Sequence, residues 1–155
     1  QADFLNKHWG ELKNIDLVIV SPLTRCLQTA AHIFKGCDVP MIVCENAREF
    51  PMGQQYSNKR SQKSILMKDF PHVNFDDLRT EEDTLWDPDN YESLYNLSKR
   101  VSNVKKLLES RSEKNIVLVA HSTFLMKLLF NVVDEDESKE LKHCHPYIFT
   151  QDSDY

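Results

Sequence analysis

An arginine and a histidine each follow a strand-like apolar run in this chain. Residues 15–20 lead through a polar turn to Arg25, and residues 115–120 lead directly to His121. Both runs are apolar at nearly every position, which is typical of parallel strands covered on both faces. Because parallel strands end at one edge of a sheet, we expect Arg25 and His121 to face one ligand. Expected helix N-termini at the same edge make a phosphate group the first candidate.

Each of these two residues also has a simpler interpretation. Arg25 lies in the first turn of an expected helix, where a cation opposes the helix dipole. It either pairs with a surface carboxylate or binds an anion that compensates this cost. His121 is either a packed structural histidine or a ligand-binding group. Because both residues are expected at one edge of the sheet, we favour the ligand-binding interpretation for each.

A third candidate, Glu49, follows a shorter expected strand at residues 40–45. If this strand is parallel to the others, Glu49 lies at the same edge of the sheet. A neighbouring phosphate raises the pKa of a carboxyl, which makes Glu49 a candidate general acid. The alternative is a loop glutamate that pairs with Arg48. Ser122, next to His121, is a candidate for a further hydrogen bond to the ligand.

The hydrophobic periodicity predicts a single α/β domain over residues 1–155. Residues 146–151 are expected to form a last strand. Five helices are expected: residues 2–12; residues 22 to about 34, with Ser21 as N-cap and Pro22 as the first helical residue; residues 61–69; residues 90–111, capped by Asp89 or Asn90; and residues 123–132.

Residues 50–89 form a long excursion between these elements and show little sustained hydrophobic period. Stretches of this length with so little regular structure are usually functional or mobile. We expect this segment to fold over the strand ends as a lid or a wall that sets specificity.

The composition excludes several function classes. The 155 residues carry a formal net charge of -5 at pH 7, which argues against nucleic acid or an anionic membrane as the main partner. No apolar run approaches the ~20 residues of a membrane-spanning helix. The four cysteines form no Cys-x-x-Cys pair and have no zinc-ligand spacing. We therefore expect free thiols in a reducing compartment, the cytoplasm, and no metal site.

The segments around the candidate residues resemble the histidine phosphatase superfamily, which has the phosphoglycerate mutase-like fold. Residues 21–30 read Ser-Pro-Leu-Thr-Arg-Cys-Leu-Gln-Thr-Ala and match the family's Ser-Pro-Leu-x-Arg-x-x-Gln-Thr-Ala signature at every fixed position. Arg48-Glu49 and residues 119–122 resemble the segments that carry the acid and the second histidine of the family. The order of these matches along the chain makes the resemblance specific.

The resemblance implies a three-layer fold with a mostly parallel sheet and helices on both faces. It also implies hydrolysis of a small phosphomonoester through a phosphohistidine, without a metal or other cofactor. Arg25 and His121 would hold the phosphoryl oxygens, and Glu49 would protonate the leaving oxygen and then activate water. Ser21, Thr24 and Ser122 lie in or beside the matching motifs and are candidates for binding substrate.

Residues 50–89 resemble a eukaryotic branch of the superfamily that is often called phosphoglycerate mutase-like. They do not resemble the longer insertion of the glycolytic mutases, which favours a phosphatase. In this branch Lys59 and Arg60 are expected to face the substrate. The alternative is that both are solvent-exposed cations of a loop.

The family's nucleophile, a histidine in an Arg-His-Gly motif on its first strand, has no match in this chain. The sequence contains no Arg-His dipeptide. We expect an upstream segment to supply this strand, placed between the elements that carry Arg25 and His121. Without it, the strand at 115–120 has an open edge that favours a homodimer, and the segment alone is expected to be inactive. Two alternatives remain: a phosphoglycerate mutase, which requires a bisphosphoglycerate primer, and a non-catalytic phosphate-binding or interaction domain.

Overall fold

The computed structural model describes residues 1–133 and 141–149. Its α-helices, 3-10 helices (η) and strands follow in the order α1 (Ala2–His8), η1 (Gly10–Asn14), β1 (Leu17–Val20), α2 (Thr24–Ile33), β2 (Met41–Val43), η2 (Glu45–Ala47), η3 (Tyr56–Asn58), α3 (Lys63–Asp69), β3 (Val73–Asn74), α4 (Leu94–Glu109), β4 (Ile116–Val119) and α5 (Ser122–Phe130).

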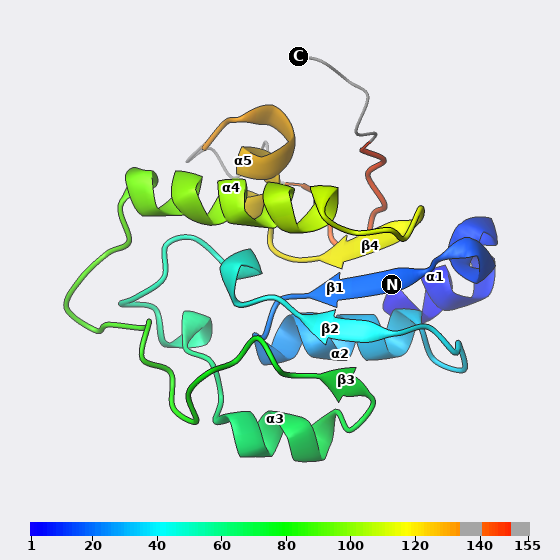
Figure 1. Ribbon diagram of the computed structural model, residues 1–155, viewed down its shortest axis with the longest axis horizontal. Coiled ribbons are helices and arrows are strands. Elements are labelled where there is room, and N and C mark those ends of the chain that lie inside the picture. The colour runs from blue at the N-terminus through cyan, green and yellow to red at the C-terminus, as the bar shows by residue number, and fades with distance from the viewer. Residues whose placement is uncertain (134–140, 150–155) are drawn as a thin grey trace.

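The four strands form one parallel sheet in the order β3-β2-β1-β4 (Figure 1). β1 pairs with β4 along its whole length, from Leu17 opposite Ile116 to Val20 opposite Val119. The strands that lead to Arg25 and His121 are therefore direct neighbours. The expectation of a further strand between them is wrong, because their pairing leaves no position for one. A strand added next to β4 can pair only at its outer edge.

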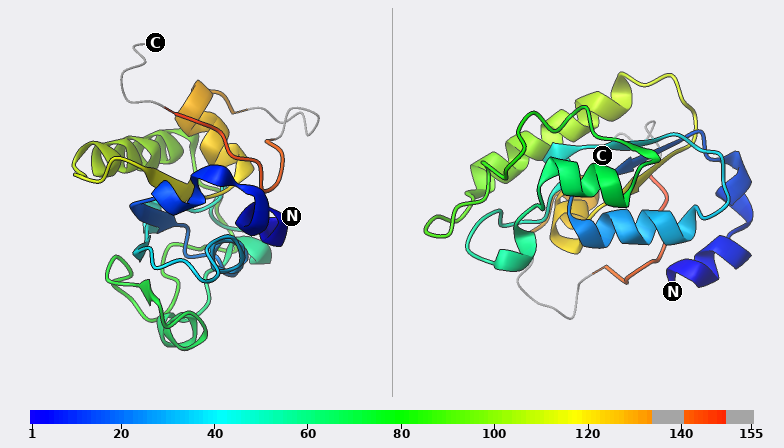
Figure 2. Two further views of the ribbon diagram at one scale, coloured as in Figure 1. Left: turned by 90° about the vertical axis from the view of Figure 1, so that its right-hand side faces the viewer. Right: turned by 90° about the horizontal axis from the view of Figure 1, so that it is seen from below.

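Helices cover both faces of the sheet because the side chains of a strand alternate in direction. Val18 and Val20 of β1 pack in one apolar cluster with α2 and α3. Leu17 and Ile19 pack in a second cluster with α4 and α5. Figures 1 and 2 show α4 and α5 on one side of the sheet and α2 and α3 on the other. This arrangement confirms the predicted α/β fold, with a parallel sheet between helical layers.

The start of α2 differs from the prediction. Ser21 is not its N-cap and Pro22 is not its first helical residue, because the N-cap is Leu23. The hydroxyl of Ser21 is buried and hydrogen-bonded to the ring of His121 instead. The same hydroxyl accepts only a long hydrogen bond from the N–H of Leu23, at 3.4 Å, ahead of the helix.

The start of α4 also differs. Its N-cap is Ser93, whose hydroxyl accepts a hydrogen bond from the N–H of Asn96 at 3.2 Å. The predicted caps, Asp89 and Asn90, donate hydrogen bonds to the carboxylate of Asp87 and form a turn ahead of the helix. The helix predicted from residue 90 therefore begins only at Leu94, and the turn at Asp87 occupies the positions before it.

Three further segments depart from the sequence-based expectations. The predicted helix at residues 2–12 divides into α1 and η1, and the excursion contains β3, which pairs with β2. Residues 146–149 form no strand. The remainder of that predicted strand, 150–151, and the acidic run at 134–137 lie outside the described residues.

Within the described ranges, no helix combines the length and the apolar character that crossing a membrane requires.

Candidate functional site

His121 follows β4 and occupies the N-cap position of α5. Its ring is buried, with Nε2 at 2.8 Å from the hydroxyl of Ser21 and 3.5 Å from the thiol of Cys26. Burial, reinforced by the positive charge of Arg25, lowers the pKa of His121 to about 3. The ring is therefore neutral at pH 7, and a bound anion is what would favour its protonation.

Arg25 lies in the first turn of α2 and is exposed. Its guanidinium donates hydrogen bonds to the carbonyl of Ser57 at 2.6 Å and to the side-chain oxygen of Asn58 at 3.0 Å. Both acceptors are neutral, so these contacts orient the guanidinium without cancelling its charge. The alternative in which Arg25 pairs with a surface carboxylate is not found among the described residues. An oriented and uncompensated cation at a helix N-terminus is suited to bind an anion.

Glu49 follows η2 and reaches the same edge of the sheet. One carboxylate oxygen accepts a hydrogen bond from the N–H of Phe50 at 2.8 Å, and the other lies 4.0 Å from Nδ1 of His121. The latter contact is not an ion pair, because His121 is neutral. Burial raises the pKa of Glu49, although the N–H of Phe50 and the charge of Arg25 act in the opposite direction. A raised pKa is the direction that favours a carboxyl as a proton donor.

An ion pair between Arg100 of α4 and Glu92, which precedes this helix, holds the loop that carries Glu49. Arg100 pairs with Glu92 at 2.6 Å and donates hydrogen bonds to the carbonyls of Asn46 at 2.7 Å and Arg48 at 2.9 Å. A weaker bond reaches the carbonyl of Glu49 at 3.4 Å. The backbone on both sides of Glu49 is thus fixed by one buried guanidinium.

Arg48 does not pair with Glu49, contrary to the simpler interpretation of that glutamate. Its fully buried guanidinium binds both carboxylate oxygens of Asp83, at 2.8 and 2.6 Å. It also donates to the carbonyl of Asn58 at 2.7 Å. Arg48 therefore ties the excursion to the sheet edge and leaves the Glu49 carboxyl free to face His121.

The other motif residues have more varied positions. Ser21 contacts His121, as described above, and the hydroxyl of Thr24 lies 3.4 Å from that of Ser61. The hydroxyl of Ser122 accepts a hydrogen bond from the N–H of Leu141 at 3.0 Å. Ser21 is thus placed to orient His121, whereas Thr24 and Ser122 are engaged with neighbouring segments.

The two adjacent cations of the excursion differ in their surroundings. Lys59 is exposed, and its ammonium lies 4.7 Å from the ring centre of Trp86. Arg60 is buried and donates hydrogen bonds to backbone carbonyls, including those of Thr80 and Glu82. The structure therefore does not bring Arg60 to the surface where the sequence placed it, because its guanidinium is used to hold the excursion together.

Sequence reasoning assigned no role in this site to two of its contributors. Cys26 was not singled out, although it directly follows Arg25 and lies against His121. Burial raises the pKa of its thiol to about 12, so Cys26 stays neutral. Arg100 lies far along the chain from Glu49, and only the contacts across the fold show that it holds the Glu49 loop.

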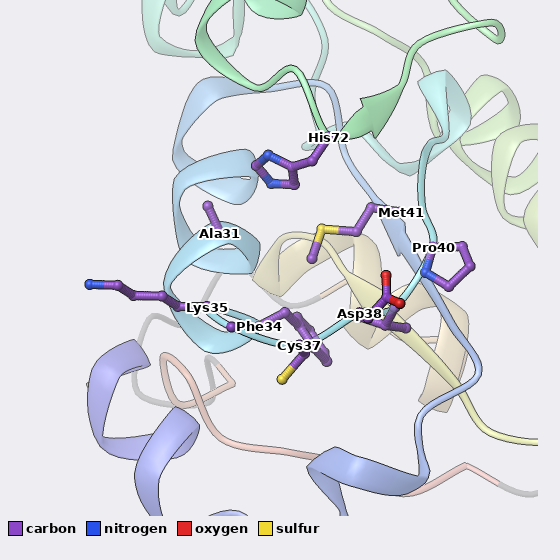
Figure 3. Close-up of a pocket in the computed structure, with 10 residues that line it drawn as sticks. Ala31, Phe34, Lys35, Cys37, Asp38, Pro40, Met41 and His72 are labelled. Carbon is purple, nitrogen blue, oxygen red and sulfur yellow. The ribbon is translucent and has the colours of Figure 1, made fainter.

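The remaining histidines do not add to this edge. His8 is the last residue of α1, and His32 lies in the last turn of α2 and contacts Asp3. His143 and His145 lie beside α1. His72 lines an open pocket at the amino end of β2, together with Lys35, Asp38 and Met41 (Figure 3). That pocket is at the opposite end of the sheet from His121, so it is separate from the candidate site.

The site as a whole joins one exposed cation, one neutral imidazole and one carboxyl of raised pKa beside the N-terminus of α5. Such a group can bind an oxyanion and supply a proton to an oxygen attached to it. No cluster of three side chains suited to hold a metal ion is found in the ranges that the structure covers.

Comparison with known proteins gives a consistent result. The chain is 33% identical over 177 residues to "Phosphoglycerate mutase-like protein 1" of Arabidopsis thaliana, an alignment that covers 94% of this chain and 60% of that protein. It is 31% identical to a second "Phosphoglycerate mutase-like protein" of the same plant, with 83% and 59% covered. The chain thus spans about three fifths of the length of these curated relatives.

Solved structures show the same fold at lower sequence identity. The alpha-ribazole phosphatase from Shigella flexneri is 24% identical with a TM-score of 0.53, over 83% of this chain and 61% of that one. The ecdysone phosphate phosphatase from Bombix mori, solved with tungstate, is 16% identical with a TM-score of 0.54, over 98% and 60%. The model of the histidine phosphatase superfamily (branch 1) matches residues 1–148. The chain therefore belongs to branch 1 of the histidine phosphatase superfamily.

Proposed function

We propose that this protein is a phosphatase that acts on a small phosphomonoester. The observation that carries this proposal is the convergence of Arg25, Glu49 and His121 at one sheet edge, with Glu49 and His121 4.0 Å apart. In this proposal Arg25, His121 and the first amides of α5 hold the phosphoryl oxygens. Ser21 orients His121 through their 2.8 Å contact.

Glu49 is proposed to act first as acid and then as base. A nucleophilic imidazole nitrogen bonds to phosphorus while the bond from phosphorus to the alcohol oxygen breaks, and Glu49 gives its proton to that oxygen. Water then attacks phosphorus and loses its proton to Glu49, while the bond between phosphorus and the imidazole nitrogen breaks. This step releases inorganic phosphate and restores the imidazole. The raised pKa of Glu49 supports the first of these roles.

The attacking imidazole is proposed to come from a further strand paired at the outer edge of β4. Two observations support this position. The described histidines other than His121 lie away from the site, and all four residues of β4 are only half-buried. A strand at this edge would cover the apolar side chains of β4 and end beside His121.

The setting of the protein is part of the proposal. Its four free cysteines favour a reducing compartment, and we place the protein in the cytoplasm. Its net negative charge argues for a small phosphorylated partner rather than nucleic acid. When the edge of β4 is open, pairing with a second copy is proposed, and sedimentation velocity over a range of protein concentrations tests this homodimer.

Isothermal titration with inorganic phosphate and with orthovanadate tests the binding site in the chain as given. Replacement of Arg25 by alanine removes charge-assisted hydrogen bonds to the anion. We expect it to lower the affinity for both anions by about ten- to a hundredfold. Arg79→Ala, at another exposed arginine of the excursion, is the matched control and is expected to bind as the wild type does. Equal affinities of wild type and Arg25→Ala would refute the assignment.

A phosphoglycerate mutase is the second candidate, favoured by the names of the plant relatives. The two functions differ in what the reaction requires. A mutase depends on a bisphosphoglycerate primer, whereas a phosphatase releases inorganic phosphate without one. Phosphate binding without either reaction in the longest natural form of the protein would favour a non-catalytic phosphate-binding function.

A further inference from the structure

Two aromatic side chains and a lysine gather at the rim of the candidate site. The rings of Tyr56 and Trp86 meet edge to face, with 6.1 Å between their centres. The ammonium of Lys59 lies 4.7 Å from the ring centre of Trp86 and 5.8 Å from that of Tyr56. We call these three residues the aromatic rim. Nothing in the phosphoryl-binding group described above uses them.

The aromatic rim is joined directly to the phosphate-binding arginine. The guanidinium of Arg25 binds the carbonyl of Ser57 at 2.6 Å and the side chain of Asn58 at 3.0 Å. These acceptors are the two residues between Tyr56 and Lys59 in the sequence. A ligand whose anionic end contacts Arg25 therefore lies next to the turn that carries Tyr56 and Lys59.

The backbone beneath the rim is held by buried groups. The side chain of Asn58 is buried and donates to the carbonyl of Pro51 at 3.0 Å. The backbone carbonyl of Asn58 accepts a hydrogen bond from Arg48 at 2.7 Å. The indole N–H of Trp86 donates to the carbonyl of Gln55 at 3.1 Å. The rim is thus a fixed surface, so a ligand that packs on it need not order a mobile loop first.

The surface of the rim includes an exposed aromatic side chain. Tyr56 is 77% exposed even though the turn that carries it is anchored on buried side chains. Aromatic faces attract other rings in edge-to-face or offset arrangements, and the charge of Lys59 adds an attraction for electron-rich rings. Small-molecule sites commonly combine such apolar surfaces with a few fixed polar groups.

We infer that the aromatic rim binds an aromatic ring in the alcohol part of the phosphomonoester, while Arg25 binds its phosphate. This inference rests on the proposed function and assigns a substrate class to it, the phosphate esters of alcohols or phenols that carry a planar ring. Tyr56 supplies the packing surface. Trp86 and Lys59 hold that surface in place and set its charge.

Isothermal titration with three phosphonates tests this inference, because phosphonates have no ester bond to cleave. Phenylphosphonate, cyclohexylphosphonate and methylphosphonate share the anionic group and differ only in the organic part. We expect phenylphosphonate to bind about three- to tenfold tighter than the other two. Tyr56→Ala is expected to bring the three affinities together, and Tyr56→Phe to keep the preference.

Tyr95 provides the matched control, because it is also 77% exposed but lies on α4. Tyr95→Ala is expected to keep the preference for the phenyl group. Equal affinities for all three phosphonates, equal binding of the phenyl and cyclohexyl compounds, or an equal loss in Tyr56→Ala and Tyr95→Ala would each overturn the rim while leaving the phosphate site standing. Failure of all three phosphonates to bind would instead overturn the proposed function itself, and the rim with it.

Discussion

β1 and β4 are neighbouring strands of similar composition that have different environments. β1 reads Leu-Val-Ile-Val and β4 reads Ile-Val-Leu-Val, and the two pair in register over their whole length. Every residue of β1 is buried, at 1% exposure or less, whereas every residue of β4 is only half-buried. The difference comes from position in the sheet, since β1 lies between β2 and β4 while β4 pairs on one side only.

The comparison indicates which strand holds its part of the candidate site more rigidly. β1 leads to Ser21, Arg25 and Cys26 from a buried strand with two partners. β4 leads to His121 from an edge strand whose outer backbone groups have no partner strand in the described sheet. An apolar edge of this kind invites pairing with another strand. We therefore expect the β4 side to be the more easily perturbed.

The largest difference is expected in stability. Ile19 is completely buried, so Ile19→Ala should lower the free energy of unfolding by about 3 kcal/mol through lost burial and an unfilled cavity. Leu118, on β4 and paired with Ile19, is only half-buried, and Leu118→Ala should cost only about 1 kcal/mol. Urea denaturation of the two variants measures this contrast. Equal losses would show that β4 is as well covered as β1.

The second difference is expected in the dependence of stability on pH. The pKa of His121 is about 3 in the folded chain and near 6.5 when unfolded, so the unfolded state takes up the proton first. Stability is thus fully present above about pH 6.5 and falls by up to about 1.4 kcal/mol per unit as the pH decreases toward 3. Cys26, in the first turn of α2 after β1, has a pKa of about 12 and contributes nothing in this range.

Measuring the pH dependence of stability in the variants His121→Gln and Cys26→Ala compares the β4 side of the site with the β1 side. His121→Gln should flatten the stability profile between pH 6.5 and 5, whereas Cys26→Ala should leave its slope unchanged. Glu49 affects stability in the opposite direction. Because its pKa is raised, the folded chain takes up this proton before the unfolded chain does, which increases stability as the pH falls. An unchanged slope in His121→Gln would contradict the burial assigned to His121.

The smallest difference is expected in backbone protection. Amide hydrogens of β1 should exchange with solvent only on global unfolding, while those of β4 that point to the outer edge should exchange at least about tenfold faster. Hydrogen exchange followed by NMR resolves the two strands residue by residue. Uniform slow exchange along both strands would mean that the outer edge of β4 is covered by another partner.

The sequence predicted the two strands and their chemistry because these depend on local patterns. Apolar runs of strand length define β1 and β4, and polar residues at their carboxyl ends are brought together by parallel pairing alone. The order β1 next to β4 did not follow, since neighbouring positions in a sheet depend on contacts between distant segments. The same holds for β3, whose two residues carry no period of their own.

The outcome for single side chains depended on long-range partners. Ser21 has the right residue type for an N-cap, but its hydroxyl is hydrogen-bonded to the ring of His121, a hundred positions away. Arg60 is a loop cation in the sequence, yet carbonyls of residues 80–82 bury its guanidinium. Lys59, its neighbour, stays exposed, and its ammonium lies over the rings of Tyr56 and Trp86. Residue type alone does not distinguish these cases.

A titration of the ¹⁵N-labelled chain with orthovanadate tests the central claim most directly, namely that Arg25, Glu49 and His121 form one oxyanion site. The account predicts saturable shifts of the Arg25 side-chain resonances and of the amides of Phe50, His121 and Ser122, all with the same dissociation constant. Shifts confined to the pocket of Lys35, Asp38 and His72 at the other end of the sheet, or no saturable shift at Arg25 and His121, would contradict it.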